Sequence, residues 1–393
     1  AAETQSDYSS DCSTALARQT ITFFRKEQNM NNVYKDFIYL TYCSLNRVVP
    51  DKERISNTDL EKLFAVSRHQ TLVSLTAFAL ETADIYNSRF DDAKEKAIRK
   101  NLFLDTERKK LFAFCENKGI WYMPLKGSIL KGIYPEYGMR QMADNDILYD
   151  ITYREDVRKY FESLGYEVFL YGKKNHDIYM KPPVLNFEMH YDLFGEYINS
   201  VWADYYSDIK NRLIKDQDNQ YGYHFSDDDF YIYITTHEYK HFSRNGTGLR
   251  SLADRYVFIK NKDLDLNYIE AECQKLGIAE YEKESRELSL KLFEHEPDLD
   301  KFTDAELKML NCYLDSGTYG SVENKIAKSL KNQSKLSFWI QNIFIPRKLM
   351  KYSVPFTAAS PLLYPIGVIW RCCRVLIKNR GLLRQTVKAV KKY

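Results

Sequence analysis

Hydrophobic residues recur every three or four positions over about residues 22–99, and this spacing predicts a helical region. Thr58 and Glu61 lie three residues apart before an apolar run, which is the pattern of a helix-capping box. The first residues are polar and lack this periodicity. We therefore expect a disordered segment over residues 1–20 and a helical region over residues 21–104.

Beyond residue 104 the pattern changes to short apolar segments separated by turns. A helix is expected over residues 106–117, because Lys118-Gly119 is a typical C-terminal stop, and another over residues 154–164. The segments that fit strands are 120–125, 144–150, 166–170, 176–181 and 185–191. This mixture predicts an α+β core over residues 105–197.

After Ile198 the apolar spacing becomes helical again. Ser226 is placed to cap a helix that includes the segment HEYKH, and residues 247–260 carry an apolar stripe on one helix face. Residues 198–323 are expected to form a helical domain. Residues 324–393 form a separate basic tail.

Acidic residues on two predicted strands suggest a metal site. Asp144 and Asp146 are two residues apart, so they lie on one face of their strand. Like charges held side by side are costly unless a cation neutralises them, and Mg²⁺ takes a few carboxylates together with phosphate oxygens. Glu188 on another strand can complete a site for two ions about 4 Å apart. Mg²⁺ or Mn²⁺ is the expected cofactor.

A phosphate-binding segment precedes these acids. Gly127 and Ser128 follow a predicted strand and open a helix, which leaves backbone N–H groups and a hydroxyl to hold a phosphate. Lys126 can reach a phosphate, and Arg140 can pair with another. A lone D-x-D is more often a solvated turn, but the ordered set of strand, GS, helix, D-x-D strand and acidic strand is much more specific.

The segment PLKGSILKGIYPEYGMRQMADNDILYD resembles the signature of nucleotidyltransferase family 5, within the DNA polymerase β-like superfamily. It matches the pattern LKG…L…YP…R…D-x-D-hydrophobic at each position in order. The later FEMHYDLF resembles the family's acidic-x-His-aromatic strand. LRSLADRYVF, with Arg250 and Asp254, resembles a helical motif nearer its C-terminus. The resemblance covers roughly residues 30–370.

This resemblance implies a polymerase-β-like mixed sheet core with flanking N- and C-terminal helical regions. It implies an enzyme that transfers a nucleoside monophosphate from an NTP such as ATP to a hydroxyl or phosphate acceptor, releasing pyrophosphate. In that scheme Asp144 and Asp146 hold both metal ions, Glu188 holds the catalytic one, and Gly127 and Ser128 position the triphosphate.

Two polar residues on the predicted strands have open roles. Asn145 stands where the family usually has an apolar residue, and its side chain is expected to point into the core, where it can hydrogen-bond the backbone. His190 lies two residues from Glu188 on the same strand face. It either orients an acceptor or a carboxylate, or it is a buried histidine satisfied by its neighbours.

The segment HEYKH at residues 237–241 matches H-E-x-x-H, which on a helix can hold zinc between His237 and His241. A zinc site needs a third ligand, and no distinctive one is found, so a zinc hydrolase is the weaker alternative. We expect instead that this helix, with Arg250 and Asp254, forms a wall of the nucleotide or acceptor pocket. A second alternative is a catalytically silent relative that binds a nucleotide or a membrane partner.

The charge is unevenly distributed along the chain. The net charge is +3, but residues 1–323 carry 42 basic and 54 acidic residues, a net charge of −12. Residues 324–393 carry 15 basic residues and no Asp or Glu. This tail either docks on the acidic body or binds an anionic surface, and its alternating apolar and basic positions favour lipid over nucleic acid.

Cysteine usage bears on the compartment. The seven cysteines are scattered without a C-x-x-C pair, and the N-terminal AAETQSDYSS has no apolar signal core. Three prolines in the uncharged segment 353–370 argue against a membrane-spanning helix. A cytoplasmic location is expected, with peripheral membrane attachment through the tail.

Overall fold

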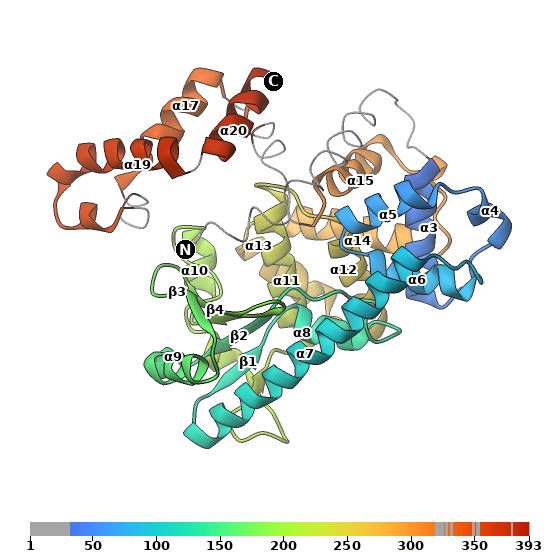
Figure 1. Cartoon of the computed structure of the whole chain (residues 1–393), viewed down its shortest axis with the longest axis horizontal. Coiled ribbons are helices and arrows are strands. Elements are labelled where there is room, and N and C mark those ends of the chain that lie inside the picture. The colour runs from blue at the N-terminus through green and yellow to red at the C-terminus, as the bar shows by residue number, and fades with distance from the viewer. Residues whose placement is uncertain are drawn as a thin grey trace.

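The computed structural model describes residues 32–318, 326, 329–330, 333–347, 350, 354–378 and 380–392 (Figure 1). The segment expected to be disordered, residues 1–20, lies outside the described residues.

The N-terminal region is helical. Its helices are α3 (Asn32–Asn46), α4 (Lys52–Ser56), α5 (Leu60–His69), α6 (Val73–Thr82) and α7 (Ser88–Lys118). The expected capping box is wrong by one residue, because Asp59 caps α5 by accepting from the backbone N–H of Lys62. The Thr58 hydroxyl is engaged elsewhere, since it donates to Asp36 Oδ2 at 2.8 Å.

Helix α7 is much longer than the helix expected over residues 106–117. It begins at Ser88 and ends as expected before Gly119, whose left-handed φ of 72° favours glycine. The expected limit at residue 104 therefore lies inside one helix. A single buried stripe spaced for a helix continues across that limit and includes Phe90, Ala97, Asn101, Leu104, Leu111 and Cys115.

Each of the five predicted strands is present, and together they form one mixed sheet. The strands are β1 (Tyr122–Pro124), β2 (Asn145–Tyr149), β3 (Glu167–Leu170), β4 (His176–Lys181) and β5 (Leu185–His190). Their order is β1-β2-β5-β4-β3, with β2 and β5 parallel and the other neighbours antiparallel. The arrangement is an α+β fold, as expected.

The two faces of the sheet have different partners. One face packs on α7 and α9 (Arg154–Ser163) through apolar side chains of β2 and β5, namely Ile147, Tyr149, Phe187 and Met189. Because side chains alternate along a strand, Asp146 and Glu188 lie on the opposite face. That face carries the predicted site.

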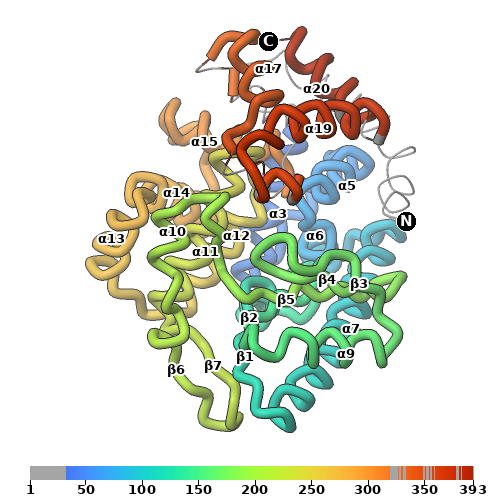
Figure 2. Tube along the Cα trace, turned by 90° about the vertical axis from the view of Figure 1, so that its left-hand side faces the viewer, coloured from blue at the N-terminus to red at the C-terminus, as the bar shows by residue number. Residues whose placement is uncertain are grey.

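The face with the acidic residues is covered by the short α8 (Gly127–Leu130), which lies between β1 and β2, and by helices that follow the sheet (Figure 2). Those helices are α10 (Ser200–Tyr205), α11 (Asp227–Phe242), α12 (Leu249–Asn261) and α13 (Leu266–Lys275). The chain continues with α14 (Ala279–Phe293) and α15 (Asp304–Ser316), which pack with the N-terminal helices. A small hairpin of β6 (Ile214–Lys215) and β7 (Tyr223–His224) lies beside β1. Short 3-10 turns are found at Lys131–Ile133, Ile151–Tyr153, Ile209–Arg212, Leu299–Lys301, Pro355–Ala358 and Pro361–Leu363.

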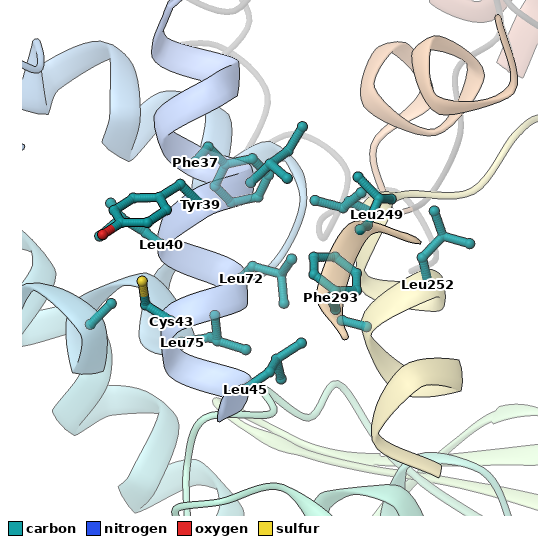
Figure 3. Close-up of a cluster of buried hydrophobic side chains, with 14 of the residues drawn as sticks. Phe37, Tyr39, Leu40, Cys43, Leu45, Leu72, Leu75, Leu249, Leu252 and Phe293 are labelled. Carbon is teal, nitrogen blue, oxygen red and sulfur yellow. The ribbon is translucent and has the colours of Figure 1, made fainter. Parts of the chain in front are cut away.

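A second core joins the N-terminal helices to the helices after the sheet. Figure 3 shows Phe37 of α3 and Leu72 facing Leu249 and Leu252 of α12 and Phe293 of α14. All five side chains are buried. The helices of residues 32–82 and of residues 249–316 thus share one hydrophobic core, which holds α12 in place over the sheet.

The tail contains α17 (Lys335–Ile343), α19 (Tyr364–Lys378) and α20 (Arg380–Lys392). The alternating apolar and basic positions at the end of the tail belong to two helices, α19 and α20. In the part of the chain that the structure describes, no helix is both long and apolar enough to cross a bilayer.

Asn145, the polar residue between Asp144 and Asp146, is satisfied by hydrogen bonds. It is completely buried, its Nδ2 donates to the carbonyl of Leu104 at 2.9 Å, and its Oδ1 accepts from Arg108 Nη1 at 2.9 Å. Both partners belong to α7. The side chain therefore fastens the acidic strand to the long helix by satisfied hydrogen bonds.

Replacing Asn145 by Leu should reduce the free energy of unfolding by about 1–3 kcal/mol, because a buried carbonyl and a guanidinium each lose a partner. Urea unfolding measures the change. Thr106→Ala is a matched control, since its hydroxyl bonds only the carbonyl of Leu102 on the exposed side of α7. That variant should change stability by less than about 0.5 kcal/mol. Equal effects of the two substitutions would contradict the anchoring role.

Candidate functional site

A cavity of about 590 Å³ lies between the acidic face of the sheet and helices α11 and α12. Ser128 is the predicted site residue that does not line it. The others that the sequence singled out do line it, namely Lys126, Gly127, Arg140, Asp144, Asp146, Glu188, His190, His237, His241, Arg250 and Asp254. The fold therefore brings residues more than a hundred positions apart into one place.

The parallel pairing of β2 and β5 brings the carboxylates together. Asp146 is the register partner of Glu188, and both side chains are on the cavity side of the sheet. Asp144 immediately precedes the strand, two residues from Asp146, and also lines the cavity. The face predicted from the two-residue period is thus the face that the cavity exposes.

Lys126 lies at the end of β1 and neutralises one of these acids. Its Nζ is 2.6 Å from Asp146 Oδ1. Burial disfavours the ammonium, but the charges of Asp146 and Glu188 outweigh burial and raise the pKa of Lys126. Its backbone has a φ of 46° and a ψ of −116°, an unusual conformation for a residue with a side chain. Such strain costs about 1–3 kcal/mol and is typical of functional positions.

Two histidines adjoin the carboxylates from neighbouring strands. His190 Nε2 lies 2.9 Å from Asp146 Oδ1 and 3.7 Å from Glu188 Oε2. His176 is the register partner of His190 on β4, and its Nε2 lies 3.8 Å from Glu188 Oε2. His190 therefore contacts a carboxylate, as one of its two predicted roles requires. His176, Glu188 and His190 also form a group whose ligand atoms all lie within 4.8 Å of one another.

The electrostatics of the acids differ from one to the next. Burial, followed by repulsion from Asp146, raises the pKa of Asp144 to about 6 and that of Glu188 to about 7. Burial also opposes ionisation of Asp146, but Lys126 and His190 outweigh it and lower its pKa. Two of the three carboxyl groups therefore lack full compensation from the protein. A donor set of this kind fits a divalent cation, which would hold all three in the ionised form.

Gly127 is required by a close approach of Arg140. A Cβ atom at this position would lie 2.4 Å from Arg140 Nη1 and 2.9 Å from Met142 Sδ. The Ser128 hydroxyl donates to the carbonyl of Leu125 at 2.6 Å, so its proton is already committed within the turn. The structure thus places Gly127 in the cavity wall, and it uses Ser128 to form the turn behind it.

Arg140 is held by a carboxylate of α12. Its Nε and Nη2 donate to the two oxygens of Asp254 at 2.7 and 2.9 Å, and both residues are buried. Tyr134 donates to the same carboxylate at 2.7 Å. This pair ties the loop before β2 to α12 and fixes two predicted pocket residues against each other. Nη1 of Arg140 is directed away from Asp254, lies beside Gly127, and donates to Met142 Sδ at 3.1 Å.

The HEYKH segment lies on α11, with both histidines toward the cavity. Its glutamate is used by the fold, since Arg255 donates to Glu238 Oε2 at 2.5 Å and Tyr313 donates to Oε1 at 2.8 Å. Among the described residues, His237 and His241 belong to no group of three metal-ligating side chains. Among these residues, the helix therefore offers no set of three zinc ligands of the kind that a zinc hydrolase needs. Both histidines line the cavity. That this wall faces a nucleotide or an acceptor stays a prediction.

Several cavity residues were not predicted from the sequence. They are the histidine of β4 and three basic residues, namely His176, Lys174, Lys240 and Arg244. Burial, followed by repulsion from Lys126, lowers the pKa of Lys240 to about 7. A signal for His176 was present, because His176 and His190 are equally distant from Pro183 in the β4–β5 hairpin. Lys240 is the fourth residue of HEYKH, and the H-E-x-x-H pattern assigns no role to that position.

Comparison with known proteins supports the family resemblance. Residues 56–294 match the model of a family described as uncharacterised nucleotidyltransferases. No curated protein and no solved structure matches the chain. The match includes every predicted site residue.

The buried pair of Arg140 and Asp254 should be strongly coupled. Asp254→Asn or Arg140→Met should each reduce the free energy of unfolding by about 3–5 kcal/mol, because each leaves a buried charge without its partner. The double variant should lose much less than the sum of the two. A double-mutant cycle by urea unfolding measures this coupling.

Arg158→Met provides the control, since Arg158 and Glu162 form an exposed pair on α9 at 2.9 Å. Its loss should be below about 1 kcal/mol. Additive losses for Arg140 and Asp254 would show that their contact does not hold the loop on α12.

Proposed function

The chain belongs to this family of nucleotidyltransferases, and we propose that it transfers a nucleoside monophosphate from an NTP, such as ATP, to a hydroxyl or phosphate acceptor with release of pyrophosphate. The observation that carries the proposal is the convergence of Asp144, Asp146 and Glu188 in one cavity beside basic side chains. A D-x-D strand paired in parallel with an acidic strand also supports a polymerase-β-like core.

The three carboxylates would hold divalent cations. When bound, such cations polarise phosphoryl oxygens and lower the pKa of the attacking hydroxyl. Asp146 belongs to β2, Asp144 immediately precedes that strand, and Glu188 belongs to the neighbouring β5, so the sheet fixes the spacing of the donors. His190 orients Asp146 through its hydrogen bond to Oδ1.

Basic groups that line the same cavity as the acids provide the complement for a triphosphate. Lys126 and Gly127 lie at one side of the cavity, and Lys240, Arg244 and Arg250 come from the helical wall. Because Arg140 is bonded to Asp254, its role in this proposal is to position the loop and to present Nη1 beside Gly127. The cavity thus combines carboxylates that can hold cations with basic side chains that can bind phosphates.

The imidazoles beside Glu188 bear on which ion is bound. His176 Nδ1 lies 3.2 Å from the Asn175 side-chain oxygen, which can only accept, so the Nε2 lone pair points toward Glu188. Mg²⁺ prefers oxygen ligands, whereas transition metals also take imidazole nitrogen. We infer that Mn²⁺ gains a nitrogen ligand here that Mg²⁺ does not.

The described cysteines form no disulfide, and they are Cys43, Cys115, Cys273, Cys312, Cys372 and Cys373. Free thiols are the usual state in a reducing compartment. This supports the cytoplasmic location that we propose for the enzyme.

Asp144→Asn and Asp146→Asn should each reduce Mg²⁺-dependent turnover by about a thousandfold or more, because each removes an anionic ligand. Glu188→Gln should also reduce turnover strongly, while nucleotide binding survives on the two remaining aspartates. Incubation with labelled NTPs and Mg²⁺ or Mn²⁺, followed by detection of pyrophosphate and of label on protein or cell extract, measures turnover. Calorimetry measures nucleotide binding.

Asp150→Asn is the matched control, because Asp150 follows the opposite end of the same strand and caps the turn at Ile151–Tyr153. It should retain full turnover. Undiminished turnover in either aspartate variant would refute the metal assignment. Nucleotide binding without turnover in the wild-type chain would favour the catalytically silent relative.

His176→Ala should weaken Mn²⁺ binding by about tenfold or more and leave Mg²⁺ binding nearly unchanged, because only Mn²⁺ uses the imidazole. Calorimetry measures both affinities, and pulsed EPR of bound Mn²⁺ should lose its nitrogen coupling. His224→Ala is the control, since His224 pairs with Asp216 at 2.6 Å outside the cavity. Equal losses for the two ions in the His176 variant would show that the histidine does not select between them.

A further inference from the structure

The helices of the tail expose apolar side chains to solvent. On α17, Leu336, Ile340, Ile343 and Phe344 are exposed, with Leu336 at 70%. Their spacing of three and four residues places them on one helix face. The opposite side of α17 is packed, because Phe338 is buried against Ala389 and Val390 of α20.

Helix α19 repeats this arrangement over three turns. Ile366, Ile369, Trp370, Leu376 and Ile377 are exposed, with Ile369 at 65% and Ile377 at 69%. Val368 on the other side is buried against Met350 and Val354. Each helix therefore has one apolar face inside the tail and a second one directed to solvent.

The two exposed faces belong to one unit. Arg371 in the middle of α19 donates to the carbonyl of Asn342 at the end of α17. The inner apolar residues of α17, α19 and α20 pack with other tail residues. The expectation that the apolar stripe packs on the acidic body therefore does not account for the exposed residues. Figure 1 shows the three helices grouped together beside the body of the chain.

The charges around these faces have one sign. Arg347, Arg374, Arg380, Arg384 and Lys388 are exposed, and Arg371 is half-buried. No Asp or Glu follows Glu323 in this sequence, so the tail holds no carboxylate to neutralise them. Arg374 lies over the Trp370 ring, 5.3 Å from its centroid, which places a cation directly beside an exposed aromatic side chain.

We propose that α17 and α19 bind the surface of an anionic lipid bilayer, with their exposed apolar faces in the headgroup region and the basic residues on anionic lipid heads. An anionic bilayer complements both features, because it accepts apolar side chains and attracts cations. Nucleic acid would complement only the charge. A second copy of the chain would bring a further unneutralised basic tail against the first. The proposal is independent of nucleotidyl transfer, and it gives that activity a location at a membrane surface.

The test is cosedimentation of the full chain with vesicles of phosphatidylcholine alone or of equal parts phosphatidylcholine and phosphatidylserine. The chain should bind the anionic vesicles and not the neutral ones, and salt should weaken the binding. The double variant Ile369→Ser/Trp370→Ser should lower the partition at least about tenfold by removing the apolar face. Arg374→Glu/Arg384→Glu should do the same, since each basic residue contributes about fivefold.

The control is Leu102→Ser/Phe103→Ser, which removes an adjacent pair of apolar residues, 53% and 56% exposed, from α7 in the body. It should leave vesicle binding unchanged. Trp370→Phe should abolish the blue shift of tryptophan fluorescence that vesicles induce. Circular dichroism confirms that each variant remains folded.

Three outcomes would overturn the proposal. One is vesicle binding that is absent, or that the Ile369/Trp370 variant leaves unchanged. Another is self-association in sedimentation velocity without vesicles, lost in the Ile369/Trp370 variant, which would assign the face to a second copy of the chain. The last is binding to single-stranded RNA that depends on Arg374 and Arg384 but not on the apolar face, together with no preference for anionic vesicles.

Discussion

Burying like charges side by side is the constraint on which this structure depends. The parallel register of β2 and β5 sets Asp146 against Glu188, with Asp144 two residues away, in a cavity where unneutralised carboxylates are costly. The protein compensates one of them, since Lys126 and His190 both contact the same oxygen of Asp146. The other two keep raised pKa values, which leaves the site with a deficit of positive charge that a divalent cation would supply.

Repelling groups stay together only if their strands are held from outside. Asn145 fastens β2 to α7 on the side away from the cavity, and Arg140 fastens the preceding loop to Asp254 on α12. Helix α12 is in turn fixed by the core that it shares with α3 and α14. The N-terminal helices thus position the site but supply none of its three carboxylates. Because their role is to pack, their sequence shows helical periodicity without candidate catalytic residues.

The sequence was sufficient for features that depend on neighbours along the chain. Each strand lies within two residues of its predicted bounds, and the two-residue period placed Asp144 and Asp146 on the correct face. Features that depend on distant residues were missed. Nothing in the sequence near Arg140 indicates that its partner, Asp254, lies 114 residues later. The expected contact of Arg140 with a phosphate therefore did not take this carboxylate into account. The N-cap of α5 was misplaced for a similar reason, because Thr58 bonds to Asp36 from another helix.

The HEYKH segment and the D-x-D segment with Glu188 differ in whether their carboxylate oxygens are available to a ligand. Glu238 of HEYKH has the residue type and spacing of a zinc-protease base, but the buried Arg255 requires a counter-charge and the Tyr313 hydroxyl takes the other oxygen. Both oxygens of that carboxylate are therefore occupied by hydrogen bonds within the fold. Glu188 has no such strong partner, since the basic side chains beside it are imidazoles at 3.7 and 3.8 Å, and burial, the largest cause, lowers the pKa of both and favours their neutral form. A short motif becomes a site only where the surrounding fold leaves carboxylate oxygens available, and in this cavity Asp144 and Glu188 meet that condition, while Asp146 is held between Lys126 and His190.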